Sequence, residues 1–279
     1  MDASTWLRPA DVHAFLDRAG GFLRSRPALH TVALTVTEGL RVRGSKVYGD
    51  EAPVFGVLEG GGVVRAAYFR TPPYPLVVTP LTAEEARSLV GHLVDIGDDV
   101  AGVNAESGTA GLVAEAWRGR TGVEPRLHER TRLYRLGELR RPEPLPEGRV
   151  RVAGEGDREL LARWYVEFVR DIGGGGHRDP GVWADTHIAD GLIGLWETPD
   201  GAPVSMAGTT AKVAGQIRVA PVYTPAELRG RGYAGAAGAD EVLLFADLAN
   251  PTSNGLYQRV GYRPVTDFAV YDLAGAADG

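Results

Sequence analysis

The segment from 219 to 262 constrains the fold of this chain more than any other part of the sequence. An apolar run typical of a β-strand covers 215–223, and the glycine-rich sequence Arg-Gly-Arg-Gly-Tyr-Ala follows it at 229–234. A second apolar strand pattern starts at Glu241. A strand, a glycine-rich loop that opens a helix and a second strand predict a βαβ crossover, in which the two strands are parallel.

The glycine-rich loop has the properties of an anion-binding site. Gly230 and Gly232 let the backbone approach a ligand closely, and the free N–H groups of a first helical turn would point at it. Arg229 and Arg231 add positive charge. The loop lacks both the Gly-Lys-Ser/Thr ending of nucleotide phosphate loops and the three-glycine dinucleotide pattern. We therefore expect this loop to bind a diphosphate, but not in the manner of either of these two nucleotide-binding motifs.

A proline-rich stretch divides the chain into two halves. Residues 140–148 hold three prolines, which makes this stretch stiff and unable to pack, as expected of an interdomain linker. The chain of 279 residues is long enough for two domains of roughly 130 residues each. We therefore expect domains at 1–139 and 149–279.

Hydrophobic periodicity predicts a mixed α/β fold. In the second half we expect strands at 149–152, 191–197, 202–208, 215–223, 241–246 and 262–273, and helices at 157–171, 181–190 and 252–260. In the first half we expect helices at 12–23, 82–94 and 109–118, and strands at 30–40, 54–58, 63–69, 76–79, 101–104 and 126–136. This order combines an antiparallel meander with one parallel crossover, so the sheet should be mixed.

The motifs of the second half resemble those of the GCN5-related N-acetyltransferases, the GNAT family. The family pattern Arg/Gln-x-x-Gly-x-Gly/Ala is matched by 229–234, and 222–225 matches its fourth strand, which splays from the fifth. The segment 247–257, with Gly261-Tyr262, is similar to the second signature of the family. The resemblance covers about 149–273. The first half looks like a diverged copy, so the chain resembles a tandem, two-domain member.

The resemblance implies acetyl-coenzyme A as co-substrate, held by the second domain. Backbone N–H groups of the glycine-rich loop would hold its diphosphate, and the end of the splayed strand would pair with pantetheine. Asn254 would hydrogen-bond the pantetheine arm, and Tyr257 would protonate the departing thiolate. The expected coenzyme-binding residues are Val222, Tyr223, Thr224, Arg229, Gly230, Arg231, Gly232, Tyr233, Ala234 and Asn254.

The general base is less well specified by the sequence. Glu167 is our first candidate, and Asp171 and Glu197 are further candidates, although carboxylates on a solvated surface are common. His177 and His187 flank the glycine-rich segment 173–176 and are candidates for lining an acceptor pocket. Plain core packing or helix capping is the alternative role for Tyr257 and Asn254.

The chain departs from the family after the glycine-rich loop. Only 235–240 separate Ala234 from the strand at Glu241, whereas the family has a helix of about four turns there. Six helical residues rise about 9 Å, and returning along a strand of five or six residues takes roughly 17–20 Å. We therefore expect that part of the crossover helix is missing from the sequence near 237–238.

Composition excludes several other classes of function. The net charge is −6 and the basic residues form no long block, which disfavours a nucleic-acid partner. The chain has no cysteine, and its histidines lack the spacing of metal ligands, so we expect neither a cysteine nucleophile nor a metal site. No apolar run is long enough to span a membrane. We expect a cytoplasmic protein without a membrane partner, either a monomer or a homodimer.

These observations predict an N-acetyltransferase. The acetyl group would pass from acetyl-coenzyme A to a primary amine of a small molecule by direct attack, which needs no cysteine. The acidic chain suits a cationic amine. The alternatives are a non-catalytic protein that binds an acyl-coenzyme A as a sensor or structural element, an acyltransferase that uses another acyl-coenzyme A, and a module that recognises a peptide or protein.

Overall fold

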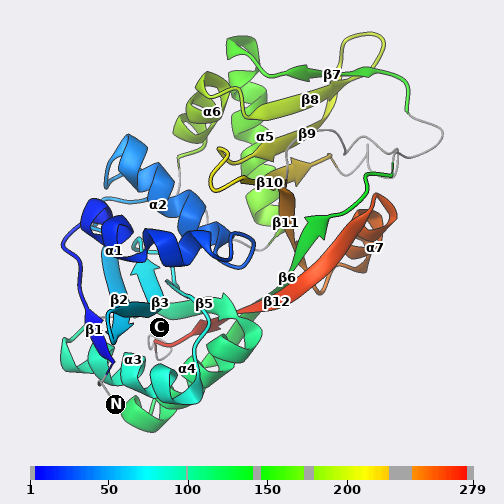
Figure 1. The fold of residues 1–279 in the computed structure, drawn as a ribbon. Coiled ribbons are helices and arrows are strands. Elements are labelled where there is room, and N and C mark those ends of the chain that lie inside the picture. The colour runs from blue at the N-terminus through cyan, green and yellow to red at the C-terminus, as the bar shows by residue number, and fades with distance from the viewer. Residues whose placement is uncertain (1–3, 99, 141–145, 173–178, 226–240, 275–279) are drawn as a thin grey trace, which may run out of the picture. The chain divides into compact units, whose positions relative to one another are not determined.

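The structure is a computed structural model, and it describes residues 4–98, 100–140, 146–172, 179–225 and 241–274. Figure 1 shows its helices and strands, which form two compact units. The first unit comprises Met1–Arg132 with Thr266–Gly279, and the second comprises Leu133–Val265. The boundary between the units falls inside two strands, 126–136 and 262–272, so each of these strands contributes residues to both units.

The first unit has helices on both faces of a mixed sheet (Figure 1). Its elements are β1 (Thr5–Leu7), α1 (Val12–Arg24), α2 (Thr31–Arg43), β2 (Val54–Gly60), β3 (Val63–Arg70), β4 (Leu76–Val78), α3 (Ala83–Asp95), β5 (Gly102–Glu106), α4 (Ser107–Thr121) and the start of β6 (Arg126–Leu136). Its strands follow the order β1-β2-β3-β4-β5-β12, in which β12 is the last strand of the chain, Tyr262–Asp272. The β4–β5 pair is parallel, and the β1–β2, β2–β3 and β3–β4 pairs are antiparallel.

The sequence prediction of a strand at 30–40 is wrong, because these residues lie in α2. The alternation of threonine and valine suggested a period of two, but Thr31, Leu34 and Thr37 are buried at a spacing of three. The Thr37 hydroxyl donates a hydrogen bond of 2.6 Å to the Ala33 carbonyl one turn earlier. A buried threonine can therefore satisfy its hydroxyl within a helix.

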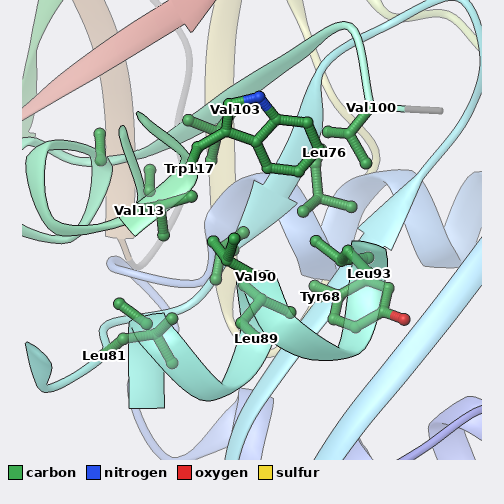
Figure 2. Close-up of a cluster of buried hydrophobic side chains, with 14 of the residues drawn as sticks. Tyr68, Leu76, Leu81, Leu89, Val90, Leu93, Val100, Val103, Val113 and Trp117 are labelled. Atoms are coloured by element: carbon green, nitrogen blue, oxygen red, sulfur yellow. The ribbon is translucent and has the colours of Figure 1, made fainter. Parts of the chain in front are cut away.

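The core of the first unit lies between the sheet and the α3–α4 pair. Figure 2 shows Leu89 and Leu93 of α3 facing Trp117 of α4, Val103 of β5 and Tyr68 of β3. Helix α3 begins with a capping box: the Thr82 side chain accepts a hydrogen bond from the backbone N–H of Glu85, and the Glu85 side chain accepts one from the backbone N–H of Thr82. The capping residues and the apolar periodicity therefore both indicate a helix that begins at this position.

The last strand of the chain completes the first unit. β12 (Tyr262–Asp272) pairs antiparallel with β5, from Phe268↔Glu106 to Asp272↔Gly102. The indole N–H of Trp117 donates to the Leu273 carbonyl at 3.0 Å. The C-terminal residues are therefore part of the sheet and core of a unit that the N-terminal half builds.

The second unit combines antiparallel and parallel strand pairs with three α-helices in its described part. Its elements are the end of β6, β7 (Arg149–Val152), the 3₁₀-helix η1 (Glu155–Asp157), α5 (Arg158–Asp171), α6 (Pro180–Ala189), β8 (Ile193–Glu197), β9 (Pro203–Thr209), β10 (Gln216–Tyr223), β11 (Glu241–Asp247), α7 (Pro251–Arg259) and the start of β12. The strands follow the order β6-β11-β10-β9-β8-β7. The β7–β8, β8–β9 and β9–β10 pairs are antiparallel, whereas β10 and β11 are parallel. The predicted mixed sheet is confirmed, and β10 and β11 form the parallel pair expected in the second half.

Among the described residues of the second unit, side chains pack in a larger and a smaller cluster. Trp164 of α5 and Trp183 of α6 pack with Leu195 and Met206 of the meander. A smaller cluster, called here the α7 cluster, joins β6, β10, β11 and the start of β12 to α7. It consists of Tyr134, Val219, Leu244, Ala246, Tyr257 and Tyr262. Among the described residues, no helix is both long and apolar enough to cross a membrane.

Candidate functional site

The parallel strands β10 and β11 pair only where they begin. Their register runs Gln216↔Glu241, Ile217↔Val242 and Arg218↔Leu243. Beyond these residues β10 continues to Tyr223 beside β9, and β11 continues to Asp247, with no further β10–β11 pair in the described part of the chain. The splayed parallel pair that the family resemblance implied is therefore present in the described part of the chain.

A β-bulge in β10 changes which way its side chains point. The register with β9 shifts between Val219↔Thr209 and Val222↔Ala207. In a regular strand Val219 and Tyr223 would face the same side, because side chains alternate with a period of two. Here Val219 packs in the α7 cluster and Tyr223 packs with α5 and α6. The bulge therefore directs Tyr223 toward α5 at the open end of the strand pair.

The predicted base Glu167 lies beside the end of β10. The buried Tyr223 donates a hydrogen bond of 2.8 Å from its hydroxyl to Glu167 Oε2. The Ser205 hydroxyl donates to the Tyr223 carbonyl at 3.1 Å and lies 2.8 Å from the Thr224 hydroxyl. The half-buried carboxylate of Glu167 is therefore fixed next to the predicted coenzyme-binding strand end.

The predicted acid Tyr257 lies on α7 in an aromatic cluster. Its ring is 6.4 Å from Tyr134 and 5.8 Å from Tyr262, measured between centroids. Its hydroxyl has no hydrogen-bond partner among the residues that the structure describes. Burial raises the pKa of the Tyr257 hydroxyl above its usual value of about 10. Tyr257 is therefore protonated at neutral pH, as a proton donor must be.

Asn254 uses most of its hydrogen-bonding capacity inside the protein. Its Nδ2 donates to the carbonyls of Asp247 at 2.7 Å and Asn250 at 2.8 Å, and its Oδ1 accepts from the Tyr134 hydroxyl at 2.8 Å. Asn250 caps α7 by accepting from the Ser253 N–H. The capping role that the sequence offered as the alternative for this region is thus present, and one lone pair of Asn254 Oδ1 is left for the predicted pantetheine contact.

Some of the predicted site lies outside the described residues. This applies to Arg229, Gly230, Arg231, Gly232, Tyr233 and Ala234, to the connection at 235–240, and to His177. Val222, Tyr223, Thr224, Asn254, Tyr257 and Glu167 are described, and all of them belong to the second unit. The structure brings Tyr223 and Glu167 together directly, and it brings Tyr257 and Asn254 together on one helix.

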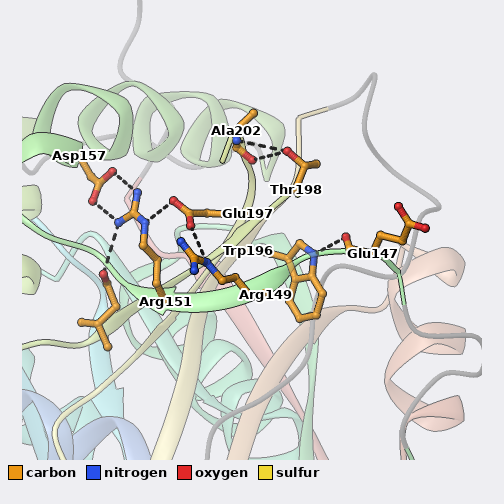
Figure 3. Close-up of polar contacts among 9 residues, drawn as sticks. Glu147, Arg149, Arg151, Asp157, Trp196, Glu197, Thr198 and Ala202 are labelled. Atoms are coloured by element: carbon orange, nitrogen blue, oxygen red, sulfur yellow. Dashed lines mark hydrogen bonds and ion pairs between the residues drawn. The ribbon is translucent and has the colours of Figure 1, made fainter. Parts of the chain in front are cut away.

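The further candidate base Glu197 is held in an ion-pair network. Figure 3 shows its carboxylate contacting Arg151 and Arg149, while Arg151 also pairs with Asp157. Hydrogen bonding to Arg151 lowers the pKa of both Glu197 and Asp157. A carboxylate that is stabilised in its charged form is a poor proton acceptor, so we assign Glu197 a structural role.

The other candidates also have structural contacts. The carboxylate of Asp171 lies 3.9 Å from its neighbour Arg170. His187 donates from Nδ1 to the Trp183 carbonyl at 2.8 Å, and its ring packs 4.5 Å from the Trp183 ring. The described residues contain no group of histidine and carboxylate side chains that could hold a metal ion.

Tyr134 is a residue of this region that sequence analysis did not identify. It lies on β6, ahead of the proline-rich stretch, and is completely buried against α7. Its strand pattern was visible in the sequence, but no local signal indicates that a strand of the first half contacts the helix at 251–259. Only the pairing of distant strands reveals it.

Solved structures of similar fold cover nearly the whole chain. A GCN5-related N-acetyltransferase from Sphaerobacter thermophilus is 18% identical and superposes with a TM-score of 0.58, over 98% of each chain. A tandem GNAT protein from the clavulanic acid biosynthesis pathway is 10% identical with a TM-score of 0.55, over 99% of this chain and 100% of its own. A GCN5-related N-acetyltransferase from Kribbella flavida is 17% identical with a TM-score of 0.55, over 88% of this chain and 95% of its own.

These likenesses show that the chain has the GNAT fold, as the sequence motifs predicted. No protein-family model matches the sequence, and no curated protein matches it significantly.

Proposed function

We propose that this chain is an N-acetyltransferase that uses acetyl-coenzyme A and a small-molecule primary amine. The observation that supports this most is the splayed β10–β11 pair, with Glu167 fixed at its open end. Pantetheine can pair with the backbone of Val222 and Thr224 as an additional strand. The glycine-rich loop at 229–234 would hold the diphosphate.

The reaction would proceed by direct attack. The amine nitrogen forms a bond to the thioester carbonyl carbon, and its surplus proton passes to Glu167. The carbon–sulfur bond then breaks, and the thiolate takes a proton from Tyr257. At the end of the reaction Glu167 has gained one proton and Tyr257 has lost one, and proton exchange with solvent restores both residues. A backbone N–H of β10 would stabilise the negative charge that develops on the carbonyl oxygen.

Binding of the donor is the first test of this function. Calorimetric titration of acetyl-coenzyme A into the purified chain should show one-to-one binding, and Gly232→Asp should abolish it, because its carboxylate would repel the diphosphate. Thermal unfolding of the variant should match that of the wild type. Absence of binding by the wild-type chain would overturn the proposed function.

The acceptor is the second test. A panel of small amines should be screened with detection of free coenzyme A thiol. We expect cationic amines to be acetylated and their neutral analogues to react more slowly. Binding of acetyl-coenzyme A without any transfer would favour the sensor alternative, and preference for a longer acyl group would favour another acyl-coenzyme A.

A further inference from the structure

Helix α7 carries the proposed acid, yet none of its side chains is fully buried. Its ring contacts are those of Tyr257 with Tyr134 and Tyr262. A helix with so little buried apolar surface is held weakly by packing alone. Its orientation on the sheet must therefore depend on polar contacts as well.

Tyr134 of β6 provides these polar contacts. Its side chain is 0% exposed, and its hydroxyl donates to Asn254 Oδ1 at 2.8 Å and accepts from Gln258 Nε2 at 3.3 Å. Asn254 and Gln258 are four residues apart, so they lie one above the other on the same face of the helix. One buried hydroxyl therefore binds two successive turns of α7 on either side of Tyr257.

The same network continues into the turn that precedes the helix. Asn254 Nδ2 donates to the carbonyls of Asp247, at the end of β11, and Asn250, the capping residue of α7. The Tyr134 hydroxyl both donates and accepts, and both Nδ2 protons of Asn254 are used. The Tyr134 hydroxyl itself is buried, so a displacement of α7 would leave this hydroxyl without its partners in a place that water does not reach.

We infer that Tyr134 is a positioning residue for Tyr257, whose hydroxyl it holds in place by fixing the orientation of α7 on the sheet. This inference rests on the proposed function, in which Tyr257 is the proton donor. Tyr134 itself does not touch the substrate. A small displacement of a proton donor from the leaving sulfur is enough to slow the reaction strongly.

This inference also assigns part of the site to the sequence before the proline-rich stretch. Tyr134 lies within 1–139, the range expected to form the first domain, whereas Tyr257, Asn254 and Gln258 lie within 149–279. The proposed acid is therefore supported by a strand that the second half of the sequence does not encode.

Tyr134→Phe in the full chain tests the inference, because it keeps the ring and removes only the hydroxyl. We expect kcat to fall about 10- to 100-fold while KM for acetyl-coenzyme A changes less than about threefold. Amide hydrogen exchange within 253–259 should become about tenfold faster. In ¹³C spectra of ring-labelled tyrosine, the apparent pKa of Tyr257 should fall, because water reaches a loosened helix.

Tyr262→Phe is the matched control, since it removes a phenol hydroxyl from the same cluster without removing a described hydrogen bond to α7. We expect less than a threefold loss of kcat. An unchanged kcat in Tyr134→Phe, or an equal loss in both variants, overturns the inference. A wild-type chain without transferase activity overturns the proposed function instead. In that case amide hydrogen exchange in α7 tests whether Tyr134 positions the helix. Faster exchange in Tyr134→Phe supports this role, and unchanged exchange overturns it.

Discussion

The hydroxyl of Tyr223 donates a hydrogen bond of 2.8 Å to Glu167, which ties the end of β10 to helix α5. The bulge in β10 makes this contact possible, because it turns Tyr223 toward the helix. Among the described residues no other hydrogen bond to the half-buried Glu167 carboxylate is present, so its second oxygen can act as an acceptor. The position of this oxygen is the basis for proposing Glu167 as the base.

Glu167→Gln should lower kcat/KM about 100- to 1,000-fold. The amide oxygen of Gln still accepts the bond from Tyr223, so we expect the fold to be preserved while the proton acceptor is lost. The measurement is the rate of coenzyme A release as a function of pH, together with the melting temperature.

Glu159→Gln is the control for this prediction. Glu159 is an exposed residue on the same helix, and its substitution removes the same charge. Its rate should match that of the wild type. A wild-type rate in Glu167→Gln between pH 6 and 9 would instead assign Glu167 a purely structural role.

Tyr257→Phe should lower kcat about 100- to 1,000-fold and leave the affinity for acetyl-coenzyme A within about threefold. Because burial raises the pKa of Tyr257, its protonated form persists above the usual titration range of tyrosine. The rate of the wild-type chain should therefore fall through deprotonation of Tyr257 only as the pH rises beyond about 10. Steady-state kinetics and calorimetry on the same preparations check both parts. A variant with full activity would mean that solvent protonates the thiolate.

Elements with strong local signals were predictable from the sequence. Helix α3 combines a capping box at Thr82 with apolar residues at helical spacing, and the structure places it at Ala83–Asp95. Strand β6 covers the predicted range 126–136. Helix α2 was not predictable in the same way, because its β-branched residues favour strands and only tertiary burial makes the helix the better choice.

Contacts between distant segments were the part that sequence could not provide. The residues around 219–262 predicted two parallel strands, and the resemblance of their motifs to the GNAT family implied that this pair is splayed; both arguments use local features of the sequence. The contact of Tyr134 with Asn254, and the pairing of β12 with β5, depend on which strands become neighbours in the sheet. No property of the individual segments specifies which strands become neighbours. The hydrogen bonds from Tyr134 to α7 are therefore seen only in the structure.

Arg151→Met should lower the melting temperature by about 3–8 °C. Arg151 pairs with both Asp157 and Glu197, whose side chains are only 12% and 7% exposed, so its removal leaves two carboxylates without their main partner. Arg149→Met is the control, because the Arg149 side chain is 79% exposed and its loss should cost little. Thermal unfolding at pH 7 measures both variants. Equal shifts would contradict the central role of Arg151 in this network.

The same ion pairs predict that the stability of the folded chain depends on pH. The pKa values of Asp157 and Glu197 are lowered from 3.8 and 4.5 in the folded chain, so the unfolded chain binds more protons as the pH falls through this range. The stability that these groups contribute is present above these values and is lost progressively below them. The difference in stability between wild type and Arg151→Met should therefore shrink below about pH 4. A difference that stays constant down to pH 3 would exclude ionic pairing as its cause.

His30 should make the first unit less stable in mild acid. Its side chain is 2% exposed and lines a small apolar cavity with Phe15 and Phe69. Its Nδ1 lies 3.0 Å from the Leu23 carbonyl, an acceptor, so Nδ1 carries the proton and Nε2 is a buried acceptor without a protein partner among the described residues. Burial lowers the pKa of His30 from 6.5, and protonation would place an uncompensated charge in this cavity.

The sign of the effect follows from proton binding. Below pH 6.5 the unfolded chain takes up a proton at His30 that the folded chain does not, so stability falls as the pH decreases, by at most about 1.4 kcal/mol per pH unit. Urea unfolding at pH 5, 6, 7 and 8 should show this slope, and His30→Leu should reduce it.

His92, whose pKa is also lowered chiefly by burial, accounts for part of the slope that remains in His30→Leu. The exposed His13, changed to Gln, is the control and should leave the slope unchanged. A slope in His30→Leu equal to that of the wild type would show that His30 does not resist protonation in the folded chain.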